Sequence, residues 1–449
     1  MQRSWGIILL ALVAWIFALN TGRRIAYTVA YLITAVMLLA FLWAWFGIHW
    51  IQIKRYTRSR RSQVGRFAEE QFEVENRSRF PKFWLEVRDL SDLPGHHTSR
   101  VISALGGHRR QRWLVRTLCQ QRGLYTLGPM VLASGDPLGL FRMERLLPAT
   151  SSLIVYPATV ELRGFAPPLG ELSGGDAMRR RTHYITTNVA GVRDYQPGDS
   201  FNRIHWRSTA RTGRLIVKEF ELDPTADVWI FLDMDQSVHV AAPWTPPSQE
   251  SYRGPFLLAR EPRQLTLIPS TEEYGVTVAA SLARHFLRRD RAVGLATYAQ
   301  RREIVQADRG ERQLDRILET LAVIKAQGEM PFAHMIALEG RHLTRSITII
   351  AITPSISHEW VIALRELRRR GVRSMAVLLA ADTFGPAPSW HETVRLLYAN
   401  NILTYVVRRG DAIDAALAEP AHLEVMPSRP HVTVFDDGRD GHGEARSRP

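Results

Sequence analysis

An apolar segment near the start of the chain constrains the fold more than any other feature. Residues Ile25 to Trp50 contain no acidic residue, lysine or arginine, and this run exceeds the ~20 residues that a helix needs to cross a bilayer. A second uncharged run, Trp5 to Leu19, holds only ~15 residues and is short for a span. We therefore predict two transmembrane helices in residues 1–50, paired as a tight hairpin.

The competing interpretation of the first apolar run is a signal peptide, with Arg3 as its charged end. No small-x-small cleavage pattern precedes Arg23, but the sequence leaves cleavage of this run open. A cluster of basic residues follows the second run and consists of Lys54, Arg55, Arg58, Arg60 and Arg61. Because basic residues that flank a span stay in the cytoplasm, we predict a multi-pass cell-membrane protein with the bulk of the chain cytoplasmic. Residues 51–64 are then a basic juxtamembrane segment that contacts anionic lipid.

Composition limits the chemistry of the remaining chain. The single cysteine, Cys119, excludes an intrachain disulfide and a zinc site built from cysteines. The net charge of +14 suggests an acidic partner, anionic lipid or nucleic acid. Membrane-associated nucleic-acid binding remains an alternative function, but the arginines are dispersed and no nucleic-acid motif is present. Nucleic acid is therefore not the expected partner.

Two further regions follow the membrane segment. Short runs rich in β-forming residues, such as Trp84–Val87, Leu124–Leu127 and Ser152–Tyr156, are separated by Gly, Pro and Asp turns. This pattern predicts a β-sandwich-like domain over residues 65–160. Residues 161–226 are predicted to be a linker that carries a charged loop.

Strands and helices alternate over residues 227–410. Asp227–Leu232 is nearly continuous in apolar residues, as expected for a strand that is covered on both faces. Apolar residues recur at helical spacing from Val276 to Leu287. The alternation predicts an α/β domain with an open, doubly wound sheet. Residues 411–449 are predicted to form a mostly disordered tail.

The loop before this α/β domain is unusually rich in functional side chains. Arginine forks form bidentate pairs with carboxylates, so Arg193, Arg203 and Arg211 can pair with Asp194, Asp199 and Glu219. The loop is predicted to be a partner-binding surface or a structural joint, with an indole as a planar anchor. Its members are Arg193, Asp194, Tyr195, Pro197, Gly198, Asp199, Arg203, His205, Trp206 and Arg211.

These residues also carry a family resemblance. The run Arg193-x-Tyr195-x-Pro197-Gly198-Asp199, followed by Arg203-x-x-Trp206 and Ala210-Arg211, resembles the bacterial family called domain of unknown function 58. Upstream matches are Arg122-Gly123-x-Tyr125-x-Leu127-Gly128-Pro129, Asp136-Pro137-x-Gly139-Leu140-Phe141 and Val155-Tyr156-Pro157. The resemblance implies a membrane-anchored protein with a von Willebrand factor A-like domain over residues 227–410. It also implies a gene encoded beside a MoxR-type AAA+ ATPase, which makes that ATPase the expected partner.

A candidate metal site follows the first strand of the α/β domain. Asp233, Asp235 and Ser237 alternate on one loop, and Mg²⁺ prefers such oxygen ligands. Domains of the von Willebrand A type use a D-x-S-x-S loop, whereas this chain has D-x-D-x-S. The strand end at Thr353 lacks the Asp that such folds supply. Mg²⁺ is therefore a candidate cofactor, and a structural role as caps or ion pairs is the competing interpretation.

A hydrolase is the alternative from another functional class. Asp199, His205 and Ser208 have the residue types of a catalytic triad, but no G-x-S-x-G elbow is present. His96, His97 and His108 fit no common zinc spacing. The sequence also lacks a phosphate-binding G-x-x-x-x-G-K motif, so any energy from ATP must come from a partner. The expected function is an adaptor that acts with a MoxR-type ATPase in the assembly or maturation of another protein complex.

Overall fold

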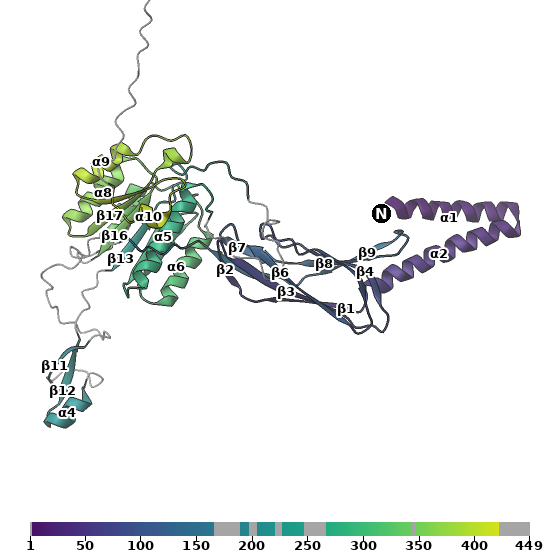
Figure 1. The fold of residues 1–449 in the computed structure, drawn as a ribbon, viewed down its shortest axis with the longest axis horizontal. Coiled ribbons are helices and arrows are strands. Elements are labelled where there is room, and N and C mark those ends of the chain that lie inside the picture. Colours follow the sequence, from purple (N-terminus) through teal and green to yellow (C-terminus); the bar gives the residue numbers. More distant parts are fainter. Residues whose placement is uncertain are drawn as a thin grey trace, which may run out of the picture.

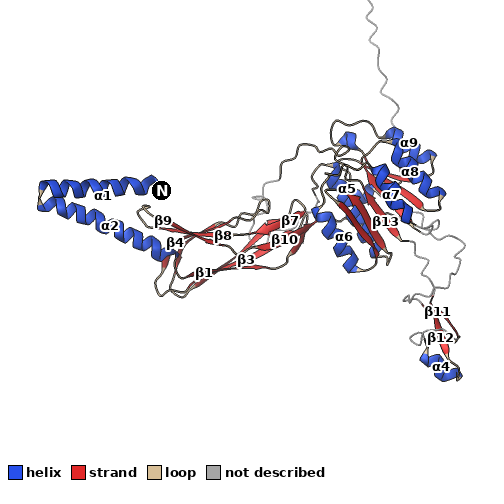
Figure 2. Ribbon diagram, turned by 180° about the vertical axis from the view of Figure 1, so that it is seen from behind, coloured by secondary structure: helices blue, strands red, loops and turns tan. Residues whose placement is uncertain are grey.

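The computed structural model describes residues 2–165, 189–196, 204–220, 227–246, 266–343 and 347–421. A helical hairpin, a β-domain and an α/β domain follow one another along the long axis of the molecule (Figure 1). A small unit of two strands and one helix lies apart from the α/β domain in both ribbon views (Figures 1 and 2). The layout is therefore multi-domain, as predicted.

The N-terminal hairpin consists of α1 (Gln2–Thr21) and α2 (Arg24–Ile48). Gly22, with φ +64°, makes the turn between them, a conformation that glycine adopts without steric cost. The helices touch where Trp15 Nε1 donates to Thr34 Oγ1 over 3.0 Å. Of the helices in the described residues, α2 is the one that is long and apolar enough to cross a membrane, while Trp5–Thr21 is a shorter apolar helix. One span is thus supported by length and composition, and the multi-pass topology stays a prediction.

The β-domain is built from three antiparallel or mixed sheets. Two of them face each other and share a core that includes Phe72, Leu85 and Leu132, which is the sandwich arrangement. These two sheets have the orders β1-β3-β6 and β5-β4-β8-β9, and a third, β2-β10-β7, lies nearer to the α/β domain. The strands are β1 (Ile51–Thr57), β2 (Arg61–Gln63), β3 (Phe67–Asn76), β4 (Lys82–Asp89), β5 (Arg100–Leu105), β6 (Arg110–Leu118), β7 (Gly123–Leu127), β8 (Met130–Gly135), β9 (Arg142–Leu147) and β10 (Ser151–Tyr156).

The β-domain begins earlier than the sequence suggested. Residues 51–64, predicted to be a separate basic juxtamembrane segment, form β1 and β2. The basic residues of β1 lie beside the acidic strand β3, because Lys54 pairs in register with Glu73 and Arg55 forms an ion pair with Glu70. The side chain of Arg55 is only 7% exposed and points into the domain. Carboxylates on a neighbouring strand therefore compensate the basic residues of β1. In the sequence alone, these basic residues resemble a cluster at a membrane surface.

The α/β domain contains a six-stranded sheet with the order β15-β14-β13-β16-β17-β18. All neighbours pair in parallel except β14 and β15, so the predicted doubly wound sheet is present with an added antiparallel edge strand. After β13 the chain forms β14 and β15 on one side of that strand. It then returns and forms β16 on the other side of β13. The strands are β13 (Val228–Leu232), β14 (Val293–Tyr298), β15 (Arg302–Asp308), β16 (Thr348–Thr353), β17 (Arg373–Leu379) and β18 (Leu403–Val407).

Helices cover both faces of this sheet, which explains why the central strand is apolar throughout. All five residues of β13 are buried. Ile230 belongs to the core under α5 and α6, whereas Phe231 belongs to the core under α7, α8 and α9. The helices are α5 (Thr271–Leu287), α6 (Glu311–Val323), α7 (Phe332–Glu339), α8 (His358–Arg369), α9 (His391–Ala399) and α10 (Ile413–Ala416).

Two segments differ from their predicted descriptions. The predicted linker, residues 161–226, contains the antiparallel pair β11 (Val189–Asp194) and β12 (Ile216–Phe220), with α4 (Trp206–Thr212) between them. The helix α10 occupies the start of the predicted tail, because Ile413 and Leu417 pack into the α/β core. The rest of that tail, residues 422–449, lies outside the described residues.

A buried arginine joins the β-domain to the α/β domain. The Arg122 side chain, which precedes β7, is 3% exposed. Its Nε donates to the Leu321 carbonyl over 3.0 Å, and its Nη2 donates to the Ile324 carbonyl over 2.8 Å. Nη2 also donates to Glu272 Oε1 over 2.6 Å, and Nη1 forms an ion pair with Glu273. One guanidinium thus binds the start of α5 and the end of α6 together.

The Arg122→Ala substitution should loosen this interface strongly. It leaves two carboxylates without their partner, and breaking a buried ion pair costs about 3–5 kcal/mol. Hydrogen exchange of the full chain should show faster exchange at the start of α5 and in β7. Arg61→Ala is the matched control, because Arg61 also bridges to α6, through Asp315 and Glu319, but is 50% exposed; such exposed pairs contribute about 0–1 kcal/mol. Equal effects of the two substitutions would contradict a central role for Arg122.

Candidate functional site

The strongest candidate site lies at the carboxyl end of β13. There the sheet changes direction between β13 and β16, and open α/β sheets bind ligands at such points. Asp233 follows β13 directly and is 2% exposed. Its Oδ2 accepts a hydrogen bond of 2.6 Å from Thr353 Oγ1, at the end of β16. Its Oδ1 accepts the Asp235 amide over 3.1 Å.

The loop after Asp233 is held in place by its own turns and by a neighbouring glycine. Asp235 Oδ1 accepts hydrogen bonds from the amide and the hydroxyl of Ser237, at 3.0 and 2.8 Å. The Gly328 amide donates to the Met234 carbonyl over 2.9 Å. A Cβ on Gly328 would lie 2.1 Å from the Tyr298 carbonyl oxygen, so only glycine permits this approach. The structure thus places Asp233, Asp235 and Ser237 on the loop that follows β13.

Burial dominates the electrostatics of Asp233. Removal of the carboxyl group from water raises its pKa to about 7, although the bonds from Thr353 and from the Asp235 amide lower it and the nearby Asp235 charge raises it further. No basic side chain forms an ion pair with Asp233 within the described ranges. At neutral pH the carboxylate therefore needs a proton or a cation to neutralise it.

The oxygen atoms around Asp233 are of the kind that binds Mg²⁺. The carboxylates of Asp233 and Asp235 and the hydroxyls of Ser237 and Thr353 are hard oxygen ligands of the kind that this ion takes. Among the described residues, no third carboxylate or histidine is grouped with the two aspartates. Bound water would have to fill the remaining positions, as is usual for Mg²⁺. The residues fit a cation in kind, and its binding stays a prediction.

Hydrogen bonds connect this corner to the domain interface. His239 Nε2 lies 3.0 Å from the Asp233 carbonyl oxygen, and Nδ1 lies 3.0 Å from Thr271 Oγ1. Burial lowers the pKa of His239, so the ring is neutral; because a carbonyl only accepts, Nε2 carries the proton. Thr271 begins α5, and the next residue, Glu272, binds Arg122. Sequence reasoning missed Thr353 and His239 as site residues. Thr353 could have been found from the sequence, because neighbouring parallel strands end at the same edge of a sheet.

The charged loop predicted from the sequence is placed only in part. Pro197, Gly198, Asp199 and Arg203 lie outside the described residues, and the side chain of Arg193 is not described. Trp206 begins α4 and is 66% exposed, so it presents its ring to solvent rather than anchoring a core. Members of the loop that the structure places on or beside β11 and α4 are Asp194, Tyr195, His205, Trp206 and Arg211. In the ribbon views this unit lies apart from the α/β domain (Figures 1 and 2).

Two members of the predicted catalytic triad are in contact. His205 Nδ1 lies 2.6 Å from Ser208 Oγ. The contact is local, because His205 is the residue before α4 and its carbonyl also accepts the Ser208 amide over 3.0 Å. Asp199, the proposed third member, lies outside the described residues. The contact joins two side chains at the start of α4, and the hydrolase remains a prediction.

A second group of titratable side chains is buried in the β-domain. Oxygen or nitrogen atoms of Glu70, Asp89 and His96 lie within 4.8 Å of one another. His96 Nε2 is 3.0 Å from both carboxylates, and its Nδ1 is 2.7 Å from Thr117 Oγ1. The guanidinium of Arg55 also contacts both carboxylates. With His96 protonated, two positive groups balance two negative ones, which indicates an ion-pair network rather than a metal site. His97 and His108 are absent from this group.

The electrostatic environment supports that assignment. Burial raises the pKa of Asp89, but hydrogen bonds from His96 and Arg55 hold it well below its usual range. Burial lowers the pKa of His96, yet its bonds to Asp89 and Glu70 raise it, and the net pKa lies above 6.5. The folded state therefore favours the charged form of both partners.

One segment that matches a known family contains the Asp233 loop and the charged loop before it. Residues 191–243 match a family described as "Protein of unknown function DUF58". This segment contains part of β11, the helix α4, the strands β12 and β13, and the Asp233 loop. The chain is 22% identical over 394 residues to "Uncharacterized protein YeaD" of Bacillus subtilis, which covers 84% of this chain and 89% of that protein.

Other similarities are partial. A stretch of 93 residues is 33% identical to "Probable nicotinate-nucleotide adenylyltransferase" of Roseiflexus sp., covering 21% of this chain and 43% of that protein. Among solved structures, a CARDB domain from Pyrococcus furiosus in complex with di-metal ions aligns with 14% identity and a TM-score of 0.19, covering 23% of this chain and 91% of that one. A TM-score this low carries no argument about function.

A cation at the Asp233 corner should stabilise the protein in a pH-dependent way. Burial raises the folded pKa of Asp233 to about 7, so without metal its contribution to stability falls as the pH rises from about 4 to about 7. Mg²⁺ should reverse this loss, adding about 1.4 kcal/mol at ten times its Kd at pH 8 and less at pH 5.5. Thermal unfolding of the detergent-solubilised chain checks this. Asp233→Asn should abolish the Mg²⁺ effect, whereas Asp290→Asn, at a residue with an 83% exposed side chain, should keep it.

The buried network in the β-domain predicts a second pH dependence, which arises from a histidine rather than from an aspartate. Because the folded pKa of His96 is raised, its contribution is complete below about pH 6.5 and is lost as the pH rises through the folded value. Hydrogen exchange in β4 should therefore accelerate in the wild type, relative to His96→Gln, as the pH rises above about 6.5, the ordinary pKa of histidine. If the difference between wild type and variant stayed constant with pH, His96 would not be charged in the fold.

Proposed function

We propose that this protein is a membrane-anchored adaptor that captures a partner protein and acts with a MoxR-type AAA+ ATPase. The observation that carries the proposal is the Asp233 corner, an oxygen-rich ligand position connected by hydrogen bonds to Arg122 at the interface with the β-domain. The bulk of the chain lies in the cytoplasm in this proposal, because basic residues follow α2. The ATPase supplies the energy, since the chain has no phosphate-binding motif of its own.

The α/β domain is, in this proposal, a von Willebrand factor A-like domain. The strand order, the antiparallel edge strand β15 and an aspartate after the first strand support it. Thr353 contacts Asp233 directly, so the second strand end contributes a hydroxyl where such folds have an acidic residue. Asp233, Asp235, Ser237 and Thr353 would hold Mg²⁺, which would offer an open coordination position to a carboxylate of the partner.

The β11–β12 unit provides a second contact surface in the proposal. Trp206, Val192 and Leu215 are 66%, 48% and 42% exposed, and aromatic residues beside arginines are enriched at protein interfaces. Arg207, Arg211 and Arg214 lie on the same unit and are exposed. An acidic protein surface with apolar pockets is the chemistry that this unit fits. Assembly or maturation of another protein complex is the process in which we place the pair of adaptor and ATPase.

A hydrolase is the second candidate, and one contact favours it. The 2.6 Å distance between His205 Nδ1 and Ser208 Oγ is suitable for proton transfer from a nucleophilic hydroxyl. The same distance also suits a local hydrogen bond between two side chains at the start of α4, and this simpler role accounts for it without a third catalytic group. The adaptor therefore remains the preferred function.

Affinity purification from native membranes tests the adaptor. The tagged full chain, solubilised in detergent with Mg²⁺, should recover an ATPase of the MoxR type. Asp233→Ala or removal of Mg²⁺ should reduce recovery by about tenfold or more, the effect of losing about 1.4 kcal/mol of binding free energy. Quantitative mass spectrometry of the recovered proteins is the measurement.

Two control variants separate the alternatives. Asp290→Ala changes an exposed carboxylate on the same domain and should leave recovery unchanged. Ser208→Ala should also leave it unchanged if the protein is an adaptor, whereas a loss of cellular function with normal partner recovery would favour the hydrolase. Absence of any ATPase from the wild-type sample would contradict the adaptor proposal.

A further inference from the structure

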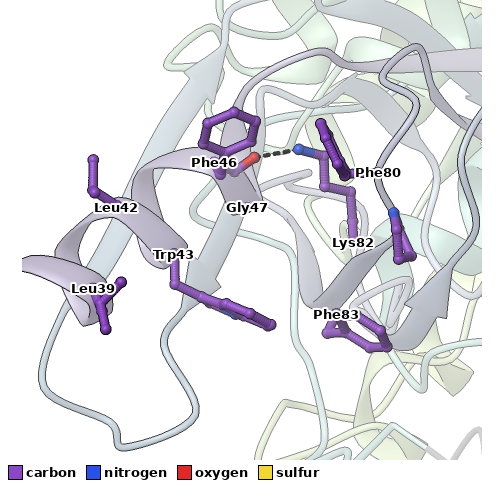
Figure 3. Close-up of a pocket in the computed structure, with 9 residues that line it drawn as sticks. Leu39, Leu42, Trp43, Phe46, Gly47, Phe80, Lys82 and Phe83 are labelled. Atoms are coloured by element: carbon purple, nitrogen blue, oxygen red, sulfur yellow. Dashed lines mark hydrogen bonds between the residues drawn. The ribbon is translucent and has the colours of Figure 1, made fainter. Parts of the chain in front are cut away.

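An apolar pocket of about 320 Å³ lies where α2 meets the β-domain. Figure 3 shows Trp43 and Phe46 of α2 on one side and Phe80 and Phe83, before and within β4, on the other. Lys82 is the only charged residue that lines it. The lining consists of Leu39, Leu42, Trp43, Phe46, Gly47, Phe80, Pro81, Lys82 and Phe83.

The position of this pocket along α2 determines which layer of the bilayer it faces. About 20 residues counted from Arg24 cross the hydrocarbon core of a bilayer and end near Trp43. The pocket therefore opens at the boundary between hydrocarbon and headgroups. Exposed aromatic rings surround it, since Trp43, Phe80 and Phe83 are 46%, 64% and 45% exposed. Aromatic residues gather at this boundary in membrane proteins.

Lys82 supplies a positive charge at the inner end of the pocket. The residue is 3% exposed, and its Nζ donates to the Phe46 carbonyl at the end of α2. Nζ also lies 5.1 Å and 5.4 Å from the ring centres of Phe46 and Trp50. Burial lowers the pKa of Lys82. Among the side chains that the structure describes, no carboxylate forms an ion pair with this ammonium group, so its charge has no counter-charge there.

We propose that this pocket binds one membrane phospholipid, with an acyl chain along Leu39, Leu42 and Phe83 and the phosphate at Lys82. An apolar wall matches the acyl chain, and the ammonium group matches the phosphate charge. A transmembrane helix of another protein would fill the apolar wall but leave Lys82 without an anion. The inference rests on the membrane-anchoring part of the proposed function and is independent of the ATPase.

Native mass spectrometry of the full chain, released from membranes in mild detergent, tests the acyl-chain site. The wild type should retain one phospholipid. Leu42→Trp, which fills the pocket, should lower the retained fraction by about tenfold or more. Leu32→Trp makes the same change at another exposed position of α2 and should have no effect. Circular dichroism of both variants verifies that they fold.

A second pair of variants tests the role of the charge. Lys82→Gln should weaken phospholipid binding by about tenfold, the effect of losing a hydrogen bond to a charged group, and should leave diacylglycerol binding unchanged because that lipid has no phosphate. Lys54→Gln, at an exposed lysine of the same domain, is the matched control. Equal losses for both lipids would place the phosphate elsewhere.

The outcomes distinguish this proposal from the anchoring on which it rests. Recovery of the protein in the soluble fraction after membrane extraction at high pH would overturn the anchoring itself. A membrane-bound wild type without a retained phospholipid, or with one that Leu42→Trp does not displace, would overturn the pocket alone. A photo-crosslinker at position 42 that captures a second copy or another protein instead of lipid would also overturn it.

Discussion

The buried guanidinium of Arg122 is the interaction on which the arrangement of the two large domains depends. It binds two backbone carbonyls at the end of α6 and two carboxylates at the start of α5, while its own backbone belongs to the β-domain. A fully buried arginine requires all of these partners, because an unpaired buried charge is strongly unfavourable. The interface is therefore specific in geometry, and displacement of either helix would cost the whole set of bonds.

This geometry has consequences at both ends of the molecule. Towards the α/β domain, Glu272 is adjacent to Thr271, which contacts His239 and through it the Asp233 corner. Towards the N-terminus, Ile48 at the end of α2 is part of the same core as the sandwich strands. The Asp233 corner is thus joined to Arg122 through His239, Thr271 and Glu272, and α2 is joined to the sandwich by packing.

Buried charge recurs in this protein, and each instance is resolved differently. Asp89 and Glu70 are balanced by Arg55 and His96 within the β-domain. Asp233 has only neutral donors in the described part of the chain, so a proton or a cation must neutralise it. Burial alone therefore does not identify a functional site, and the missing counter-charge is what distinguishes the Asp233 corner from a structural network.

Local patterns in the sequence determined the apolar span at α2, the short β-strands and the alternating strands and helices of the α/β domain, because periodicity and turn residues act over a few positions. They also located Asp233, which follows directly from an apolar strand. Tertiary structure alone decided the partners of these residues. Arg122 lies 199 positions from Leu321, and Thr353 lies 120 positions from Asp233. The sequence places the basic residue Arg55 in a membrane-surface segment, because only tertiary packing brings Glu70 of β3 and Asp89 of β4 to it. Contacts of this kind depend on strand register and domain packing, which no local pattern encodes.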